Sequence, residues 1–249
     1  MNLYEQKSMR ELQGWKRRVT RSPSFASKMA SSTQARINNM IPEKVHKAIT
    51  TAIKQMVRGV LFGVKYTVPT VAENLSFEMR EKLVQEKVEF YRKAAAAEGG
   101  VTGMGGILLG LADFPILLSM KLKLLYDIAS IYGYDVRDFK ERLYLLNIFQ
   151  LAFSSQQHRN NIFREMEHWN EKAELLPGDI HDFDWRTFQQ EYRDHIDLAK
   201  MEQLIPFVGA LVGFVVNYNL ISRLGEYSMN AYRMRWLEEN RYTSYPIDQ

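Results

Sequence analysis

Apolar residues recur at spacings of three and four along almost the whole chain, which is the period of an amphipathic α-helix. Leu12, Trp15 and Val19 mark the first such helix, which should end near Ser22-Pro23 because proline restricts the residue before it. No stretch of strict apolar and polar alternation between turn residues indicates a β-sheet. The sequence therefore predicts an all-α fold: a single multi-helix bundle with a central pair of glycine-containing apolar helices.

The composition is that of an ordinary globular protein and excludes several classes of enzyme. The chain has 249 residues, 46% hydrophobic and 25% charged, which is enough to bury a core without disulfides. With no cysteine, it lacks a thiol nucleophile, Cys-ligated zinc and iron–sulfur clusters. The first residues lead into no apolar run of signal-peptide length, so we expect the chain to stay in the cytoplasm.

The net charge of +4 combines two unlike parts of the chain. Residues 1–70 hold 13 Lys and Arg against three acidic residues, a charge of +10, and the remaining 179 residues hold 20 against 26, a charge of −6. Such asymmetry favours contact between the N-terminal part and an anionic partner, either nucleic acid or the cytoplasmic surface of a membrane. A solvated helix face is the plainer interpretation.

A second basic helix is predicted to begin at Pro42, a favoured first-turn residue, with Glu43 placed to meet the helix dipole. Apolar residues continue along it at helical spacing from Val45 to Val64. Its opposite face is basic and consists of Lys44, Lys47, Lys54, Arg58 and Lys65. This pattern is typical of a helix that rests on anionic headgroups or docks on a partner.

Two segments are almost free of charge: residues 101–120 contain only Asp113, and residues 204–221 contain none. Each approaches the roughly 20 residues that span a bilayer, but Asp113 and Pro115 disfavour a span in the first and Asn217 in the second. Small-residue spacings in both segments let helix backbones approach closely. We favour a buried helical pair at the centre of a bundle, and shallow membrane insertion and true spanning remain alternatives.

Caps and breakers predict the remaining elements. A helix should run from Asn74 or Ser76 to Ala97, and Asp113-Phe114-Pro115 should restart or kink the next one, which ends at Gly133. Further helices are expected from Asp135 to Phe153, Asn160 to Leu175, Asp184 to His195 and Gly225 to Glu239. We divide the chain into a basic helical extension (1–40), a helical domain (41–240) and a flexible tail (241–249).

Motifs for catalysis are mostly absent. The sequence contains no nucleophile elbow, no P-loop and no His-Glu-x-x-His helix, and its glycine-rich run lacks the dinucleotide spacing and a preceding strand. Glu165 and His168 form a single Glu-x-x-His pair, where a di-iron bundle needs two. His181, Glu191 and His195, with nearby carboxylates, would suit a mixed metal site, for which surface hydrogen bonding is the plainer interpretation. No helix-turn-helix signature supports nucleic-acid binding.

Asp113 and Arg223 stand at the edges of the two apolar segments. An ion pair between them would explain charged residues beside an apolar core, because a buried charge needs a partner. We favour helix capping for Asp113 and a solvated or backbone-bonded side chain for Arg223.

The sequence resembles the EcsC protein family at several ordered stretches. These are Ile41 to Val45, Gly100 to Gly106 followed by Asp113-Phe114-Pro115, Ile128 to Asp135, Leu204 to Asn217, and Ala231 to Arg233. The residues that match the family's characteristic positions are Gly103, Gly106, Asp113, Pro115, Gly209, Gly213 and Asn217. We interpret them as helix-packing and turn positions that would equally line a ligand groove.

What the resemblance implies about function is limited. The family takes its name from a bacterial protein encoded beside the ATPase and membrane subunit of an ATP-binding-cassette exporter, and no biochemical activity or catalytic residue can be carried over. We therefore expect a non-enzymatic cytoplasmic protein, without cofactor, metal or nucleic acid, that associates with the inner membrane surface or with exporter subunits. Carriage of a lipid-like ligand between the glycine-containing helices is the first alternative, and a metal-dependent hydrolase is the second.

Overall fold

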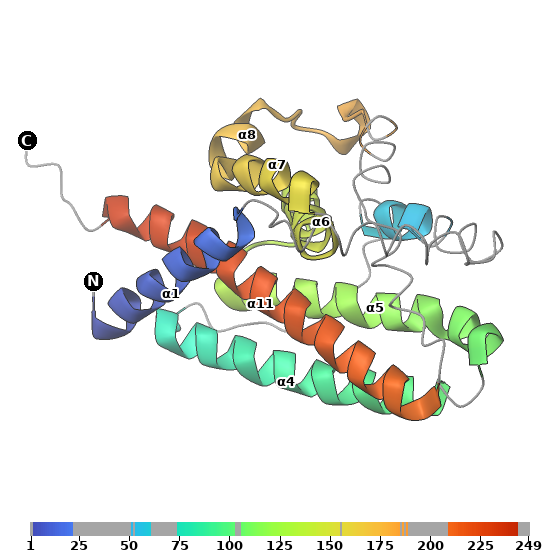
Figure 1. The fold of residues 1–249 in the computed structure, drawn as a ribbon. Coiled ribbons are helices and arrows are strands. Elements are labelled where there is room, and N and C mark those ends of the chain that lie inside the picture. The colour runs from blue at the N-terminus through green and yellow to red at the C-terminus, as the bar shows by residue number, and fades with distance from the viewer. Residues whose placement is uncertain are drawn as a thin grey trace, which may run out of the picture.

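The computed structural model describes residues 2–21, 51, 53–60, 74–102, 106–154, 156–184, 186, 188 and 209–243. Every regular element in these ranges is helical, which confirms the predicted all-α class. Three long helices form one layer: α4 (Phe77–Thr102), α5 (Gly106–Tyr132) and α11 (Gly209–Thr243). In Figure 1, α5 and α11 run in the same direction and α4 runs opposite to both.

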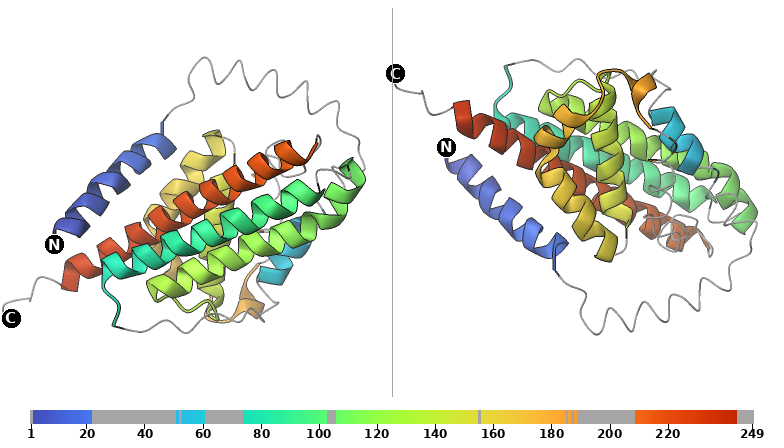
Figure 2. Two further views of the ribbon diagram at one scale, coloured as in Figure 1. Left: turned by 90° about the horizontal axis from the view of Figure 1, so that it is seen from below. Right: turned by 90° about the horizontal axis from the view of Figure 1, so that it is seen from above.

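The shorter helices lie on one side of this layer. They are α6 (Phe139–Phe153), α7 (Gln156–Glu167), α8 (Trp169–Leu175) and the 3₁₀ turn η2 (Ile180–Asp182). Helix α1 (Leu3–Val19) packs along α11 and also contacts α4 and α7 (Figures 1 and 2). The helical segment 53–60 lies in the other half of the molecule, beside α5, where the Tyr126 hydroxyl donates to the Val60 carbonyl (3.3 Å).

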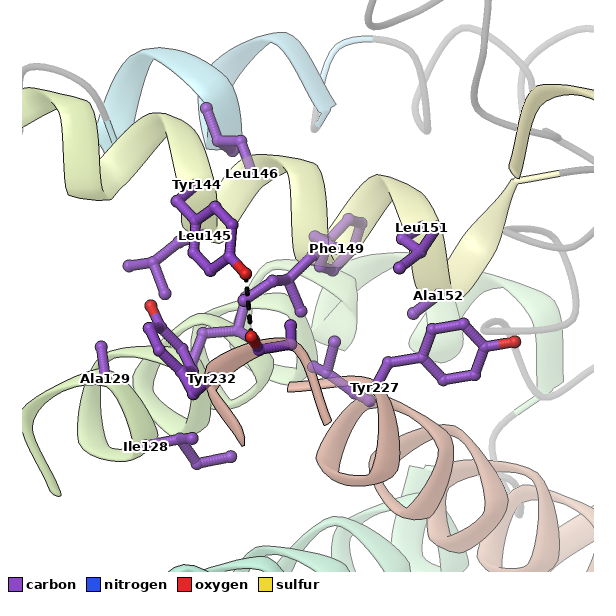
Figure 3. Close-up of a cluster of buried hydrophobic side chains, with 14 of the residues drawn as sticks. Ile128, Ala129, Tyr144, Leu145, Leu146, Phe149, Leu151, Ala152, Tyr227 and Tyr232 are labelled. Carbon is purple, nitrogen blue, oxygen red and sulfur yellow. Dashed lines mark hydrogen bonds between the residues drawn. The ribbon is translucent and has the colours of Figure 1, made fainter. Parts of the chain in front are cut away.

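The core lies where α6 meets α5 and α11. Helix α6 is buried on all sides, so its sequence shows no amphipathic stripe. Tyr144 of α6 donates a hydrogen bond to the Ala231 carbonyl of α11 (2.9 Å), and its ring packs edge-on against Tyr232 (Figure 3). Tyr232 in turn stacks on Tyr132 of α5, with ring centroids 5.6 Å apart. These aromatic contacts fix α5, α6 and α11 relative to one another.

Helix α5 ends as the sequence predicts. Gly133 adopts φ 98°, a left-handed conformation that favours glycine, and the Tyr134 amide returns to the Ala129 carbonyl (3.0 Å). The start of α5 differs from the prediction, because the helix begins at Gly106 and continues through Asp113 and Pro115 without a new start. The prediction that Asp113 caps a helix is therefore wrong. Proline removes only one backbone hydrogen bond, and a long helix packed against neighbours tolerates that loss.

The next helix boundary was also misplaced by sequence reasoning. The N-cap of α6 is Asp138, whose side chain accepts from the Lys140 amide (2.9 Å), and not Asp135. Asp135 instead accepts from the Arg137 amide (2.9 Å) and forms an exposed ion pair with the Arg137 guanidinium. Two aspartates three residues apart are equally good candidates in the sequence, and only the chain path distinguishes them.

Two further boundaries differ from the sequence expectations. The helix expected from Asn160 to Leu175 is interrupted at His168, between α7 and α8. The helix expected to begin at Gly225 is the continuation of α11, which runs 35 residues from Gly209 to Thr243. The helix expected from Asp184 to His195 lies mostly outside the described residues.

The boundary predicted at residue 40 also lies outside the described part, so the proposed domain division stays a prediction. Helix α1 buries Leu12, Trp15 and Val19, as its spacing predicts. Within the described ranges, none of the helices combines the length and apolar character needed to cross a bilayer.

Candidate functional site

The predicted basic face is described only in part. Lys44, Lys47 and Lys65 lie outside the described residues, whereas Lys54 and Arg58 are exposed one helical turn apart on the segment 53–60. The apolar side of that segment is buried in the core, with Ile53, Met56, Val57 and Val60 all at most 3% exposed. This helix therefore has no apolar face left to insert into a bilayer, and only its charged side faces outward.

The cations of α1 are partly neutralised by acids from later helices. Lys16 forms an ion pair with Glu167 of α7 (2.7 Å), and Arg18 pairs with Glu226 of α11 (3.0 Å). The basic N-terminal part of the sequence and the acidic remainder therefore meet in the folded protein. In Figures 1 and 2, α1 and the segment 53–60 lie in opposite halves of the molecule, so they do not form one continuous basic face.

The described parts of the two apolar segments lie mainly in the first halves of α5 and α11. Helices α5 and α11 both begin at the end where α4 finishes, opposite the ends occupied by Tyr132 and Thr243 (Figure 1). The described side chains here include exposed apolar groups: Ile116 of α5 is 52% exposed, and Phe214 and Val215 of α11 are 46% and 52% exposed. We call this end, defined by Ile116, Phe214 and Val215, the apolar tip.

The residues that the sequence assigned to helix packing or a ligand groove are described only in part. Gly103 lies outside the described residues, and Gly106, Asp113 and Pro115 belong to the first half of α5, where their side chains are not described. Gly209 and Gly213 belong to the first turns of α11, again without described side-chain surroundings. Of the whole set, Asn217 and Arg223 are the residues whose side chains are described.

Arg223 and Asn217 occupy different faces of α11. The Arg223 guanidinium lies 5.4 Å from the ring centroid of Tyr227, and its Nε has no hydrogen-bond partner. This cation–π contact was not foreseen, and the solvated or backbone-bonded side chain expected for Arg223 stays a prediction. Asn217 is 0% exposed and both polar atoms of its amide lack hydrogen-bond partners.

The opposite end of the layer holds a buried ion network. Arg233 of α11 donates to both oxygens of the Glu81 carboxylate on α4 (2.6 and 2.8 Å) and forms an ion pair with Glu11 of α1 (3.1 Å). Tyr4 and Tyr132 also donate to the Glu81 carboxylate (2.8 and 3.2 Å). Burial raises the pKa of the Tyr132 hydroxyl well above its ordinary value, and the Glu81 charge raises it further.

This network joins the four helices α1, α4, α5 and α11, and its own members occupy it fully. Every oxygen of Glu81 already accepts hydrogen bonds from protein donors, so the network is structural and leaves no group for a ligand. Arg235 and Glu141 form a comparable buried pair (2.7 Å), which joins α11 to α6.

Lys121 of α5 differs from these paired groups, and sequence reasoning did not single it out. Its side chain is 1% exposed and its ammonium donates one hydrogen bond, to the Leu117 carbonyl of the preceding turn (3.3 Å). A signal was present in the sequence, because Lys121 shares a helical stripe with the apolar residues Ile128 and Tyr132 at i+7 and i+11. A lysine on the inward stripe of a helix is a candidate for a special role.

The chain matches the model of the EcsC protein family over residues 6–237. It belongs to the EcsC protein family. It is 42% identical to the Protein EcsC of Bacillus subtilis (strain 168) over 234 residues, which cover 93% of this chain and 95% of that protein. It is also 31% identical over 146 residues to the Uncharacterized protein YdbA of the same organism, covering 59% of this chain and 54% of that protein. No solved structure matches the chain.

The EcsC match confirms the resemblance inferred from the glycine-containing stretches and extends it toward the N-terminus. Those stretches suggested a likeness from about residue 40, whereas the family match begins at residue 6, inside α1. This agrees with the packing of α1, whose Trp15 ring contacts Phe163 of α7 and Tyr227 of α11.

Residues considered for a metal site do not converge in the described part of this EcsC protein. No group of three or more His, Asp or Glu side chains suited to a metal ion occurs among the described residues. His168 lies 3.9 Å from Glu171 in an exposed contact, and the His181 amide is held by Asp179 (2.8 Å). Glu191 and His195 lie outside the described residues.

Proposed function

We propose that this EcsC family protein is a non-enzymatic peripheral membrane protein that attaches to the anionic inner surface of the cytoplasmic membrane through its apolar tip. The observation that carries the proposal is the exposure of Ile116 in the first half of α5 and of Phe214 and Val215 in the second turn of α11. These side chains belong to the two segments of the sequence that are almost free of charge. Both helices begin at the same end of the layer, and exposed apolar groups mark interaction sites on protein surfaces.

Cations in the same half of the molecule support attraction to anionic lipids. Lys54 and Arg58 are exposed on the segment 53–60, which lies in the half of the molecule that carries the apolar tip. The ammonium of Lys123 on α5 is also partly exposed, although it lies 3.4 Å from the Asp127 carboxylate. Each Lys or Arg near an anionic bilayer contributes about 1 kcal/mol of attraction, so apolar insertion and charge act together.

Flotation of the purified protein with lipid vesicles tests this proposal. Wild-type protein is expected to float with vesicles that contain phosphatidylglycerol and to stay behind with pure phosphatidylcholine. The double variant Phe214→Ser, Val215→Ser should bind the anionic vesicles at least tenfold more weakly, because inserting even one large apolar side chain is worth roughly 1.5–3 kcal/mol. Lys54→Glu, Arg58→Glu should weaken binding to a similar degree and make it less sensitive to salt.

Leu175→Ser supplies a matched control, because Leu175 is 87% exposed but lies at the end of α8, away from the apolar tip. Binding that falls equally in the control and in the tip variant would overturn the proposal. Binding only to native membranes, with none to protein-free vesicles, would also overturn it and would favour a membrane-protein partner such as an exporter subunit.

A further inference from the structure

The interior of the α4, α5 and α11 layer contains a buried cation, Lys121, that forms no ion pair with the described residues. Lys121 is 1% exposed, and no carboxylate of the described residues lies within ion-pair distance of its ammonium. The single hydrogen bond to Leu117 leaves two of its three N–H donors unused. A charge in an apolar interior is strongly disfavoured unless something pairs with it.

Asn217 of α11 is a second buried polar group whose hydrogen-bonding capacity is unused. Its side chain is fully buried, and neither the amide nitrogen nor the amide oxygen has a hydrogen-bond partner. Buried amides in folded proteins are nearly always satisfied, so an amide with both ends unused needs an explanation. Asn217 lies on the same helical stripe as Leu224 and Ser228, which are also fully buried, so it faces the interior of the layer.

The stacking of Tyr132 on Tyr232 sets the register of α5 against α11, and from it we infer that Lys121 and Asn217 lie at a similar level of the layer. Tyr132 of α5 stacks on Tyr232 of α11, and Leu117 and Asn217 precede these tyrosines by equal numbers of residues on two helices that run in the same direction. Helix side chains lean toward the N-terminus, and the Lys121 ammonium accordingly reaches back to the Leu117 carbonyl. The ammonium therefore lies at the level of Asn217.

Helix α4 supplies two charged residues that act near Lys121 and Asn217. Its Arg92 guanidinium hydrogen-bonds the hydroxyl of Tyr218, the residue after Asn217. Its Glu98 acts electrostatically on Lys121. Burial lowers the pKa of Lys121 to about 8, and the Glu98 charge partly offsets this, so the ammonium remains mostly protonated at neutral pH.

We propose that Lys121 and Asn217 together bind the anionic headgroup of a single-chain amphiphile, either the carboxylate of a fatty acid or the phosphate of a lysophospholipid. The ammonium and the amide NH₂ each supply donors to one of the headgroup oxygens, and the acyl chain extends toward the exposed Ile116, Phe214 and Val215. This function goes beyond membrane attachment, because it assigns a specific internal ligand to the layer behind the apolar tip.

Titration calorimetry of delipidated protein tests the proposal with defined probes. Wild-type protein is expected to bind palmitate or 1-palmitoyl lysophosphatidate, and the tighter of the two identifies the headgroup. Hexadecanol, which has the chain without the charge, and sodium acetate or inorganic phosphate, which have the charge without the chain, should bind at least tenfold more weakly. The near-isosteric variants Lys121→Met and Asn217→Leu should each lose tenfold or more in affinity for the preferred lipid.

Two substitutions on the same helices serve as matched controls. Lys123→Met changes a lysine whose side chain is 42% exposed, and Asn230→Leu changes an asparagine whose amide already donates to the Glu226 carbonyl (2.9 Å). Both should bind the lipid like the wild type. With palmitate labelled with ¹³C at its carboxyl, the pKa of the bound carboxyl should lie lower in the wild type than in Lys121→Met, which a purely structural lysine would not cause.

Equal lipid affinity in the wild type, Lys121→Met and Asn217→Leu would overturn the proposal, as would equal binding of hexadecanol and palmitate. Absence of binding by any of these probes to the folded wild-type protein would overturn it as well. None of these outcomes bears on vesicle flotation, so the two proposals can fail separately.

Discussion

Lys121 forms no ion pair with the described residues, unlike the buried carboxylates of Glu81, Glu141 and Asp127. Glu81 is paired with Arg233, Glu141 is paired with Arg235, and the Asp127 carboxylate lies 3.6 Å from the Lys87 ammonium. Removing one member of such a pair leaves the other charge buried without a partner, so these pairs behave as structural units. Lys121 has no such partner among the described residues, so its replacement by an apolar residue should relieve a cost.

Lys121→Met should therefore stabilise the delipidated protein, and the effect should depend on pH. The pKa of Lys121 is about 8 in the folded state against 10.5 in the unfolded chain, so the unfolded state binds more protons between these values. Wild-type stability consequently rises with pH across this window. The variant should be more stable than the wild type at pH 7, by up to roughly 3 kcal/mol, and the difference should shrink toward pH 10.

Urea denaturation at pH 7, 8.5 and 10 measures this difference, with Lys123→Met as the reference variant. Lys123 is 42% exposed, and the buried Asp127 carboxylate keeps Lys87 and Tyr91 as partners without it, so its replacement should change stability little at any pH. A Lys121→Met variant that is less stable than the wild type at pH 7, or an advantage that does not change with pH, would show that the Lys121 charge is compensated in the folded state.

At the scale of the helices, Gly225 shows why α11 can lie so close to α4. A Cβ atom built on Gly225 would approach the γ carbons of Val88 to 2.6 and 2.7 Å, a distance that real Cβ atoms do not reach. The sequence suggested that Gly225 begins a new helix. Gly225 instead lies inside α11, where its lack of a side chain lets α11 pack closely against α4. A glycine can therefore mark the end of a helix in one context and a close contact between two helices in another.

Gly225→Ala is expected to destabilise the protein by about 1–3 kcal/mol, because overpacking outweighs the gain in helix propensity. Gly59→Ala is the matched control, since a Cβ at Gly59 meets nothing within 4 Å and alanine should be neutral or slightly stabilising there. Thermal denaturation of both variants compares them directly. A Gly225→Ala protein as stable as the wild type would contradict this account, because it would show that Val88 adjusts without cost. In that case, adding Val88→Ala to Gly225→Ala would not raise the stability.

The sequence predicted the helices more reliably than their ends. Helical spacing gave the all-α class, the buried face of α1 and the end of α5 at Gly133, because each depends on a local pattern. The starts of α5, α6 and α11 were misplaced, since a proline or an aspartate is compatible with several chain paths and tertiary packing decides among them. Asn217 was selected from the sequence, but the buried state of Lys121 depends on which face of α5 meets its neighbours.

At the scale of the whole molecule, folding redistributes the charge asymmetry of the sequence. Ion pairs of Lys16 with Glu167 and of Arg18 with Glu226 bring acids of the later helices against α1. Helix α1 and the segment 53–60 are also far apart, so the basic part of the sequence does not form a single surface in the described residues. Apolar exposure at the tip, and not charge alone, is therefore the main support for membrane attachment.

The most direct test of membrane attachment is the environment of single labelled positions on vesicles. The chain has no cysteine, so Phe214→Cys and Leu175→Cys each give one site for an environment-sensitive fluorophore. With phosphatidylglycerol vesicles, emission from position 214 should shift to the blue and be quenched by lipids brominated in the acyl chain, whereas emission from position 175 should not change. A label at position 214 that stays in water while the protein is bound to the vesicles, or equal changes at both positions, would contradict attachment through the apolar tip.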